Sequence, residues 1–247
     1  MSVLVLVPTY NERENLLRLV PRILAHEGYG VLVVDDGSPD GTGEVADALH
    51  SAHPSRVSVL HRRRKEGLGP AYVAAMRHAL TLGPQFICQM DADGSHDPAD
   101  LPRLVAAAAE CDLVIGSRYV TGGALRNWAW HRVALSTTAN KYLRRMTGIG
   151  IHDCTAGFRC WTAAMLARLN VDTLRSNGYG FQVETLYRTL LLGGRVCEIP
   201  IVFTERVRGR SKMSSRIMIE AALLPWRLRS ELGRLPATRA ADRTASA

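Results

Sequence analysis

Residues 2–42 have the sequence SVLVLVPTYNERENLLRLVPRILAHEGYGVLVVDDGSPDGT, and this stretch decides the fold. Two apolar runs of strand length, 2–7 and 31–35, flank a segment in which Leu16, Leu17 and Val20 begin a helical spacing. Strands that are apolar on both faces are typical of parallel sheets covered by helices. The stretch therefore predicts a β-α-β unit of an α/β protein.

The same alternation continues outward along the chain. Helices are predicted near 42–52, 70–82 and 98–109, and strands near 57–61, 86–90 and 112–116. Beyond residue 120 the pattern weakens, and we expect helices near 131–146, 181–192 and 216–231 with short strands near 196–204. The predicted fold class is α/β, with a mostly parallel sheet flanked by helices and amphipathic helices toward the C-terminus.

Size and composition restrict the class of protein. The chain has 247 residues, 47% hydrophobic and 22% charged, which fits a single globular domain over 1–232. The tail 233–247, rich in Pro, Ala, Arg, Thr and Ser, is predicted to be disordered. No window reaches the roughly 18 apolar residues of a membrane span, and the start turns polar too early for a secretory leader. We therefore expect a cytoplasmic protein.

The five cysteines are predicted to be buried thiols. Their number is odd, no C-x-x-C pair occurs, and most lie among apolar neighbours. This pattern indicates neither a disulfide framework nor a zinc site.

Charge divides the chain into two unlike halves. Residues 1–120 contain 11 Lys and Arg and 15 Asp and Glu, whereas residues 121–247 contain 20 and 8, so the halves carry net charges of −4 and +12. A positive half is suited to phosphate groups of nucleic acid, lipid or substrate, although a solvated basic face explains it equally well.

Polar clusters follow four of the predicted strands. They are PTYNE (8–12), DDGSPDG (35–41), DADGS (91–95) and SRY (117–119). Ligands of open α/β sheets bind beyond the carboxyl ends of the strands, so a binding site is expected there. Neither G-x-G-x-x-G nor G-x-x-x-x-G-K-[ST] occurs, which disfavours a nicotinamide-binding Rossmann domain and a P-loop enzyme.

Asp91 and Asp93 are candidates for a metal site. Two carboxylates at a strand end can hold a hard divalent cation, which can in turn bridge a diphosphate. The alternative is a turn and helix cap, which Asp-Gly-Ser also supplies. Asp35 and Asp36 are similarly placed to accept hydrogen bonds from a ribose or a base.

Other candidate residues have simpler explanations as well. The cations at 62–65 precede glycines at a helix start and could approach an anion, but a solvated charge run is expected for Arg62 to Arg64. The cluster 206–212 holds four cations that suit phosphate oxygens. His96 could be a metal ligand, but a surface residue is the expected state. Asp153 and Glu184 are expected to orient neighbours.

Together these motifs resemble family 2 glycosyltransferases with the GT-A fold. The motifs are PTYNE, VVDDGSPDGT, GLG (67–69), MDADGSHDP, IGSRY, GFR, GYGFQVE and RVRGRSK, in this order from residue 3 to about 230. GSRY, the stretch 127–132 and the R-x-R-G-x-S-K motif resemble those of the branch that transfers mannose to polyprenyl (dolichyl-type) phosphates. By this resemblance, 1–120 is the nucleotide-sugar half and 121–232 the acceptor and membrane-facing half.

The resemblance implies a set of site residues. Nucleotide-sugar binding is assigned to Pro8, Tyr10, Glu12, Val34, Asp36, Asp91, Ala92, Asp93, Arg118, Arg206 and Lys212. Acceptor phosphate binding is assigned to Arg118, Arg132, Arg206 and Lys212, and a catalytic role to Asp91, Asp93 and Arg118. Asp91 and Asp93 would ligate Mg²⁺ or Mn²⁺, and Ser95, which replaces the glutamine of some relatives, would be a third ligand.

The implied reaction is an inverting transfer of mannose from GDP-mannose to a polyprenyl monophosphate, giving a β-linked mannosyl phosphate. A lipid monophosphate is already anionic at neutral pH, so its oxygen needs little general-base help. One alternative is transfer of glucose or another sugar from a UDP-sugar to the same kind of lipid. Another is a non-catalytic nucleotide or nucleic-acid binding module, which the acidic strand ends disfavour, so no nucleic-acid partner is expected.

A lipid acceptor requires contact with a membrane. The segments 131–146 and 216–229 combine apolar residues with arginines, which is typical of helices lying in the interface. Packing on the protein's own core is the alternative. We expect a peripheral protein on the cytoplasmic face, bound directly or recruited by a membrane-embedded partner protein.

Overall fold

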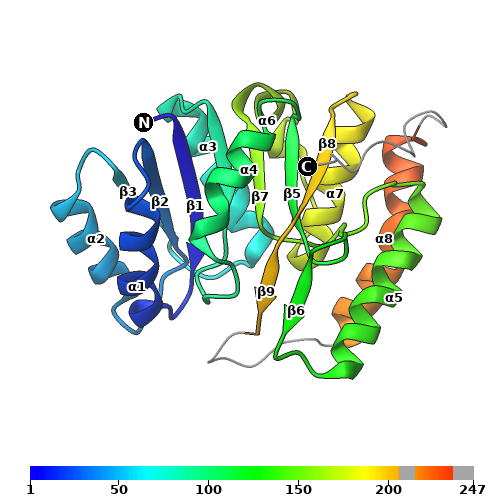
Figure 1. The fold of residues 1–247 in the computed structure, drawn as a ribbon, viewed down its shortest axis with the longest axis horizontal. Helices are drawn as coiled ribbons and strands as arrows, with labels where there is room; N and C mark the ends of the chain where they lie inside the picture. Colours follow the sequence, from blue (N-terminus) through cyan, green and yellow to red (C-terminus); the bar gives the residue numbers. More distant parts are fainter. Residues whose placement is uncertain (206–214, 236–247) are drawn as a thin grey trace.

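A computed structural model describes residues 1–205 and 215–235, and side chains of 215–221 are not described. The main sheet has the order β3-β2-β1-β4-β7-β5-β8 (Figure 1). Its strands are β1 (Val3–Thr9), β2 (Tyr29–Asp35), β3 (Val57–His61), β4 (Phe86–Gln89), β5 (Leu113–Ser117), β7 (Arg159–Thr162) and β8 (Val196–Pro200). All adjacent pairs are parallel except those that β7 makes with β4 and β5. The mostly parallel α/β fold that the sequence predicted is confirmed.

Helices cover both faces of the sheet (Figure 1). They are α1 (Arg13–Leu24), α2 (Thr42–Ala52), α3 (Leu68–Leu82), α4 (Leu101–Ala107), α5 (Trp130–Thr147), α6 (Ala163–Arg168), α7 (Gly178–Leu191) and α8 (Ser215–Leu232), with 3₁₀ turns η1 (Pro98–Asp100) and η2 (Val171–Thr173). Two short strands, β6 (Ala124–Arg126) and β9 (Val202–Thr204), form a separate parallel pair.

Alternation along β1 assigns its side chains to two cores. Leu4 and Leu6 belong to the cluster shared with α3 and α7, whereas Val3, Val5 and Val7 belong to the cluster shared with α1 and α4. Successive side chains of a strand point to opposite faces of the sheet. The apolar run at 2–7 is therefore buried on both sides, as the sequence indicated.

Strand β7 was not predicted from the sequence. Its residues, Arg159 to Thr162, contain a charged group and form no apolar run, yet Arg159 is fully buried in the middle of the sheet. The Arg159 guanidinium donates to Ala156 O at 2.8 Å, Gln182 O at 2.8 Å and Cys154 O at 3.0 Å. Burial lowers the pKa of Arg159 to about 10, and these bonds explain how the charged group is accommodated.

The cysteine prediction needs a correction. Cys111 and Cys197 form a disulfide, with Cα atoms 6.1 Å apart, while Cys88, Cys154 and Cys160 are buried free thiols as expected. The parallel pairing of β5 with β8 brings together two residues that are 86 positions apart in the sequence. The number and the spacing of cysteines in a sequence do not predict a disulfide between two residues so far apart.

Helices α5 and α8 lie side by side along one edge of the molecule (Figure 1). Tyr142 of α5 donates to Ala222 O at 2.7 Å, and Arg229 of α8 donates to Met146 O at 2.8 Å. Among the residues whose structure is described, no helix combines the length and apolar character needed to cross a bilayer. The predicted tail 233–247 falls almost wholly outside the described part of the chain, which ends at residue 235.

Candidate active site

A cavity of about 1000 Å³ lies beyond the carboxyl ends of β1, β2, β4 and β5. Most of the residues that the sequence assigned to a site line it: Pro8, Tyr10, Glu12, Asp36, Asp91, Ala92, Asp93, Ser95, Arg118 and Arg132. Its other walls come from α3, α5, α7 and α8, with apolar side chains such as Leu68, Leu135, Leu143 and Leu224. One cavity thus joins acidic strand ends to an apolar region between helices.

Three assigned residues do not take part in the described cavity lining. Val34 is fully buried in the core shared with α3 and does not line the cavity, and its carbonyl accepts from Thr9 Oγ1 at 3.2 Å. Arg206 and Lys212 lie outside the described residues.

Asp36 is held by the basic loop in front of α3. Arg62 donates to the Asp36 carboxylate and, at 2.7 Å, to Glu66. Burial raises the pKa of Asp36, and the charge of Arg62 only partly offsets this effect. The expectation of a solvated run is wrong for Arg62, whose side chain is only 11% exposed. Its neighbour Lys65 lies over the ring of Tyr10, 3.8 Å from the centroid.

The loop after β4 presents a carboxylate held by its own backbone turn. Asp93 Oδ1 accepts from Ser95 Oγ at 2.6 Å and from Ser95 N at 3.1 Å, while Gly94 adopts φ 77°. This is the turn that Asp-Gly-Ser favours, and it fixes the carboxylate at the cavity wall. Ser95 is therefore an orienting group for Asp93, and its proposed role as a metal ligand remains a prediction.

The donor set of this loop fits a hard divalent cation. Among the described residues, no group of three or more His, Cys, Asp or Glu side chains forms a complete metal cage. Asp91 and Asp93 line the cavity together. Magnesium is commonly held by one or two carboxylates, with substrate phosphates and water as the remaining ligands. Two carboxylates beside a cavity open to a diphosphate meet this requirement.

His96 is not the surface residue that the sequence suggested. It is buried, its ring stacks on Phe158 with centroids 4.9 Å apart, and its Nδ1 accepts from Asp91 N at 3.3 Å. Burial lowers the pKa of His96 to about 4, so the ring is neutral at pH 7. The chain folds back after Asp93, and this packing could not be inferred from a single histidine in a polar loop.

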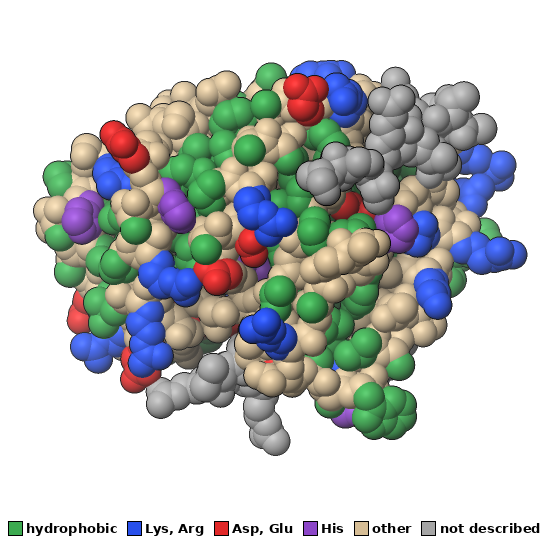
Figure 2. Space-filling model, in the orientation of Figure 1, with side chains coloured by type: hydrophobic (Ala, Val, Ile, Leu, Met, Phe, Trp, Pro, Cys, Tyr) green, Lys and Arg blue, Asp and Glu red, His purple; other side chains and the backbone are tan. Residues whose placement is uncertain are grey.

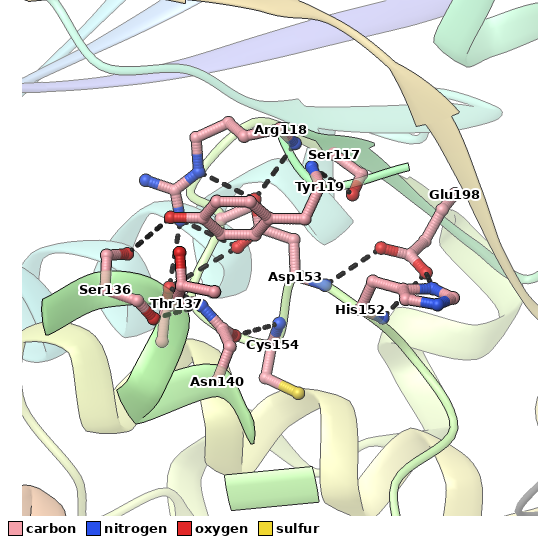
Figure 3. A network of polar contacts seen from close by, with 12 residues as sticks. Ser117, Arg118, Tyr119, Ser136, Thr137, Asn140, His152, Asp153, Cys154 and Glu198 are labelled. Carbon is pink, nitrogen blue, oxygen red and sulfur yellow. Dashed lines mark hydrogen bonds and ion pairs between the residues drawn. The ribbon is translucent and has the colours of Figure 1, made fainter. Parts of the chain in front are cut away.

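Arg118, at the end of β5, is fixed by a buried carboxylate (Figure 3). Its Nε donates to Asp153 Oδ2 at 2.7 Å, its Nη2 to Asp153 Oδ1 at 2.7 Å, and its backbone N to Asp153 Oδ2 at 3.1 Å. Burial opposes the charge, but the Asp153 carboxylate outweighs it and holds the pKa of Arg118 above its usual value. The orienting role predicted for Asp153 is confirmed.

A second arginine lies beside an aromatic cluster. Arg132 forms an ion pair with Glu205, and its guanidinium lies 4.7 Å from the ring centroid of Trp128. Phe203 packs edge-on against Trp128 at 5.6 Å, and Arg118 lies 5.4 Å from the Phe203 ring. Arg118 and Arg132 therefore face the same cavity across an aromatic wall.

Glu184, the other predicted orienting carboxylate, also holds its neighbours. It accepts from Ser176 N at 2.8 Å and from Arg188 Nη2 at 2.7 Å. Burial alone would raise the pKa of Glu184. The hydrogen bonds lower this pKa by more than burial raises it, so the net shift is downward.

Several cavity residues were missed from the sequence. Thr155, Phe203 and Glu205 line the cavity but belong to no recognisable motif. Phe203 and Glu205 precede the basic cluster 206–212, which is the one sequence feature that could have drawn attention to them.

The fold is that of a glycosyltransferase with GT-A architecture. The family model described as Glycosyl transferase family 2 matches residues 4–168, and the chain belongs to this family.

Curated relatives match almost the full length of the chain. The polyprenol monophosphomannose synthase of Mycolicibacterium smegmatis is 49% identical over 235 residues, covering 94% of this chain and 89% of the relative. The undecaprenyl-phosphate mannosyltransferase of Micrococcus luteus is 48% identical over 224 residues, covering 90% and 92%.

Solved structures share the fold at low sequence identity. The mannosyltransferase PcManGT from Pyrobaculum calidifontis, solved with GDP-Man and Mn²⁺, is 20% identical with a TM-score of 0.63, covering 95% of this chain and 66% of that chain. A glucosyl-3-phosphoglycerate synthase from Mycobacterium tuberculosis, solved with Mn²⁺, UDP-glucose and phosphoglyceric acid, is 18% identical with a TM-score of 0.67, covering 96% and 81%. These likenesses concern the fold.

Proposed function

We propose that this chain transfers mannose from GDP-mannose to a polyprenyl monophosphate, with inversion, to give a β-linked mannosyl phosphoryl polyprenol. The observation that carries the proposal is the near full-length identity of 49% to a polyprenol monophosphomannose synthase. The cavity supports it, because the same space offers carboxylates for a metal-bound diphosphate and an apolar region for an isoprenoid chain.

The proposed reaction forms one bond at C1 of mannose and breaks one. A phosphate oxygen of the lipid forms a bond to C1 of mannose, while the bond from C1 to the diphosphate oxygen breaks and GDP leaves with that electron pair. No proton transfer is needed at the nucleophile, because the lipid phosphate is already ionised at neutral pH. This agrees with the described cavity, where the buried His96 is neutral and engaged with Asp91 N.

The protein's own residues have distinct roles in this proposal. Asp91 and Asp93 would hold Mg²⁺ or Mn²⁺, which supplies Lewis-acid stabilisation of the leaving diphosphate. Arg118 and Arg132 face the cavity and bind phosphate oxygens; Arg132 exchanges its partner Glu205 for a phosphate when the substrate arrives. We also assign phosphate binding to Arg206 and Lys212, on the basis of the R-x-R-G-x-S-K motif.

We also propose that the edge formed by α5 and α8 lies on the membrane. Trp130, Leu223 and Trp226 are 81%, 61% and 60% exposed on these two helices. Figure 2 shows Lys and Arg side chains gathered along the same edge, with hydrophobic side chains near the start of α5. Exposed aromatic and aliphatic side chains beside cations suit an interface with anionic lipid. Leu143 and Leu224 are buried, so core packing, the alternative considered for these helices, holds for their inner sides.

A substrate comparison tests the proposed activity. The full chain is incubated with a short polyprenyl monophosphate, MgCl₂ or MnCl₂, and either GDP-[¹⁴C]mannose or UDP-[¹⁴C]glucose, and the lipid phase is counted. Label from GDP-mannose only, lost with EDTA and restored by metal, is the expected result. Label from UDP-glucose only would replace the proposal with the sister activity, and salt-sensitive RNA or DNA binding without GDP binding would indicate a non-catalytic module.

A further inference from the structure

Helix α5 is attached to the loop 152–155 by a buried side chain, Asn140 (Figure 3). Asn140 Oδ1 accepts from Cys154 N at 2.8 Å, and its Nδ2 donates to Thr155 Oγ1 at 3.3 Å and to Ser136 O at 3.1 Å. Asn140 does not itself line the cavity, whereas its neighbour Ala139 and its partner Thr155 do. The amide therefore joins the helix to the loop from behind the cavity wall.

The other side of the loop is held by β8. Glu198, which is buried, accepts from Asp153 N at 2.9 Å with Oε1 and from His152 N at 2.8 Å with Oε2. The loop is thus fixed between α5 and β8, and the Asp153 side chain is left with no solvent exposure. A carboxylate held in this way can orient a cation without the entropy loss of two free side chains.

Thr155 is the junction between this support and Arg118. Its hydroxyl accepts from Arg118 Nη2 at 3.0 Å as well as from Asn140 Nδ2, and donates to Asp153 Oδ1 at 3.4 Å. Within the described part of the chain, Arg118 Nη1 makes no hydrogen bond, and Arg118 lines the cavity. One terminal nitrogen is therefore available to a ligand, while the others set its direction.

We propose that Asn140 and Thr155 are positioning residues that aim Arg118 Nη1 at a phosphate oxygen in the cavity and make its aim depend on the placement of α5. This inference rests on the proposed function for the identity of the phosphate, which is either that of the lipid or that of the GDP leaving group. Because α5 also carries Trp130, which is 81% exposed on the edge proposed to lie on the membrane, this inference links the seating of the helix on the membrane to the orientation of Arg118.

Kinetics of matched variants test the inference. Thr155→Val removes the hydroxyl at constant shape, and Asn140→Ala removes the amide behind it. Each of these two variants is expected to lower kcat/KM about tenfold, since the loss of a hydrogen bond to a charged group produces an effect of about this size. Thr155→Ser keeps the hydroxyl and should stay within about twofold of wild type. The double variant is expected to be no worse than the poorer single variant, because both act on one network. Additive losses, or full activity of Asn140→Ala, would overturn the inference.

The control is Thr137→Val, on the same helix. Thr137 Oγ1 donates only to Val133 O at 2.8 Å within α5, and Thr137 does not line the cavity. This variant should keep wild-type kinetics. An increased KM for polyprenyl phosphate in Thr155→Val and Asn140→Ala, with an unchanged Kd for GDP-mannose, assigns Arg118 to the lipid phosphate. An unchanged KM for polyprenyl phosphate with an increased Kd for GDP-mannose assigns Arg118 to the diphosphate. Either result supports a positioning role for Asn140 and Thr155.

A spectroscopic measurement separates this inference from the proposed function. The ¹⁵Nε–H signal of Arg118, identified by its loss in Arg118→Lys, reports the Asp153 pair directly. Hydrogen exchange of this signal should be slow in wild type and Thr137→Val, and at least tenfold faster in Thr155→Val and Asn140→Ala. If wild type transfers no mannose but the exchange rates differ in this way, the positioning network stands and the proposed function fails. A lower Tm with unchanged exchange would show a merely structural role and refute the inference.

Discussion

The acidic loops after β2 and β4 and the region around Arg118 and Arg132 hold their charged groups in different ways. In the loops after β2 and β4, Asp35 accepts from Ser38 Oγ, Asp40 from Thr42 Oγ1 and Asp93 from Ser95 Oγ, each partner two or three residues away. In the arginine region, Arg118 pairs with Asp153 across 35 residues, and Arg132 with Glu205 across 73. Local turns orient these three carboxylates, whereas contacts between distant parts of the chain orient Arg118 and Arg132. Asp36 is an exception among the acidic residues, because its partner Arg62 lies 26 residues away.

This difference has a chemical rationale. A carboxylate that must receive a metal needs only a fixed direction, and a turn closed by a neighbouring Ser or Thr supplies it. A buried guanidinium needs a counter-charge as well, because an unpaired buried cation is strongly destabilising. The two regions should therefore respond differently to loss of one carboxylate.

The largest effect is expected at Asp93. Asp93→Asn keeps the size of the side chain but removes a charge from the metal site, so kcat should fall by about 10³-fold or more with little change in Tm. Initial rates with GDP-[¹⁴C]mannose and thermal unfolding by circular dichroism measure the two quantities.

Asp97→Asn is the control for this loop. Asp97 caps η1 through Ala99 N at 3.0 Å and pairs with Arg22 on the surface, away from the cavity lining. Its activity should stay within about twofold of wild type, since exposed pairs contribute at most about 1 kcal/mol. Comparable activity loss in both variants would contradict a metal role for Asp93.

The next largest effect is expected at Asp153, and here stability changes as well as activity. Asp153→Asn leaves the Arg118 charge buried without a counter-charge, so the free energy of unfolding should fall by about 3–5 kcal/mol. Urea denaturation measures it. Asp172→Asn breaks a surface pair with Arg77, whose side chains are 57% and 64% exposed, and should cost at most about 1 kcal/mol. Equal losses would show that the long-range pair is no more important to the fold than a surface pair.

A smaller effect is expected where the two halves meet, at Asn177. Its Oδ1 accepts from Gly69 N at 2.9 Å and Gly178 N at 2.8 Å, and its Nδ2 donates to Glu66 O at 3.2 Å. Asn177→Ala frees the loop that carries Lys65, so the KM for the nucleotide sugar should rise about three- to tenfold. Asn177→Asp keeps the acceptor oxygen and should recover most of the affinity; failure to do so would place the effect elsewhere.

The smallest effect is expected at the membrane-facing edge. Leu223→Ala removes an exposed leucine of α8 and should weaken binding to vesicles of phosphatidylcholine and phosphatidylglycerol about three- to tenfold. Leu17→Ala is the matched control, because Leu17 of α1 is similarly exposed at 54% but lies in the other half. Vesicle flotation measures both, and equal binding of the two variants would argue against this edge as the membrane surface.

The sequence predicted those features whose cause is local. Apolar runs determined β1, β2, β4 and β5, because a strand buried on both faces needs apolar residues throughout. The turn chemistry of Asp-Gly-Ser indicated where Asp93 would leave the sheet. Since the ends of parallel strands meet at one edge, the place of the binding site followed from these two patterns. The resemblance to family 2 glycosyltransferases supplied most of the assigned site residues.

Only the tertiary structure decided the rest. Strand β7 contains a buried arginine, and Cys111 forms a disulfide with Cys197. The ring of His96 stacks on Phe158, and Val34 belongs to the core. Each depends on partners tens of residues away, and no periodicity or turn preference encodes a single long-range pair. Alternation and turn chemistry act over a few residues, whereas the partner of a buried charge or ring is chosen by the packing of the whole sheet.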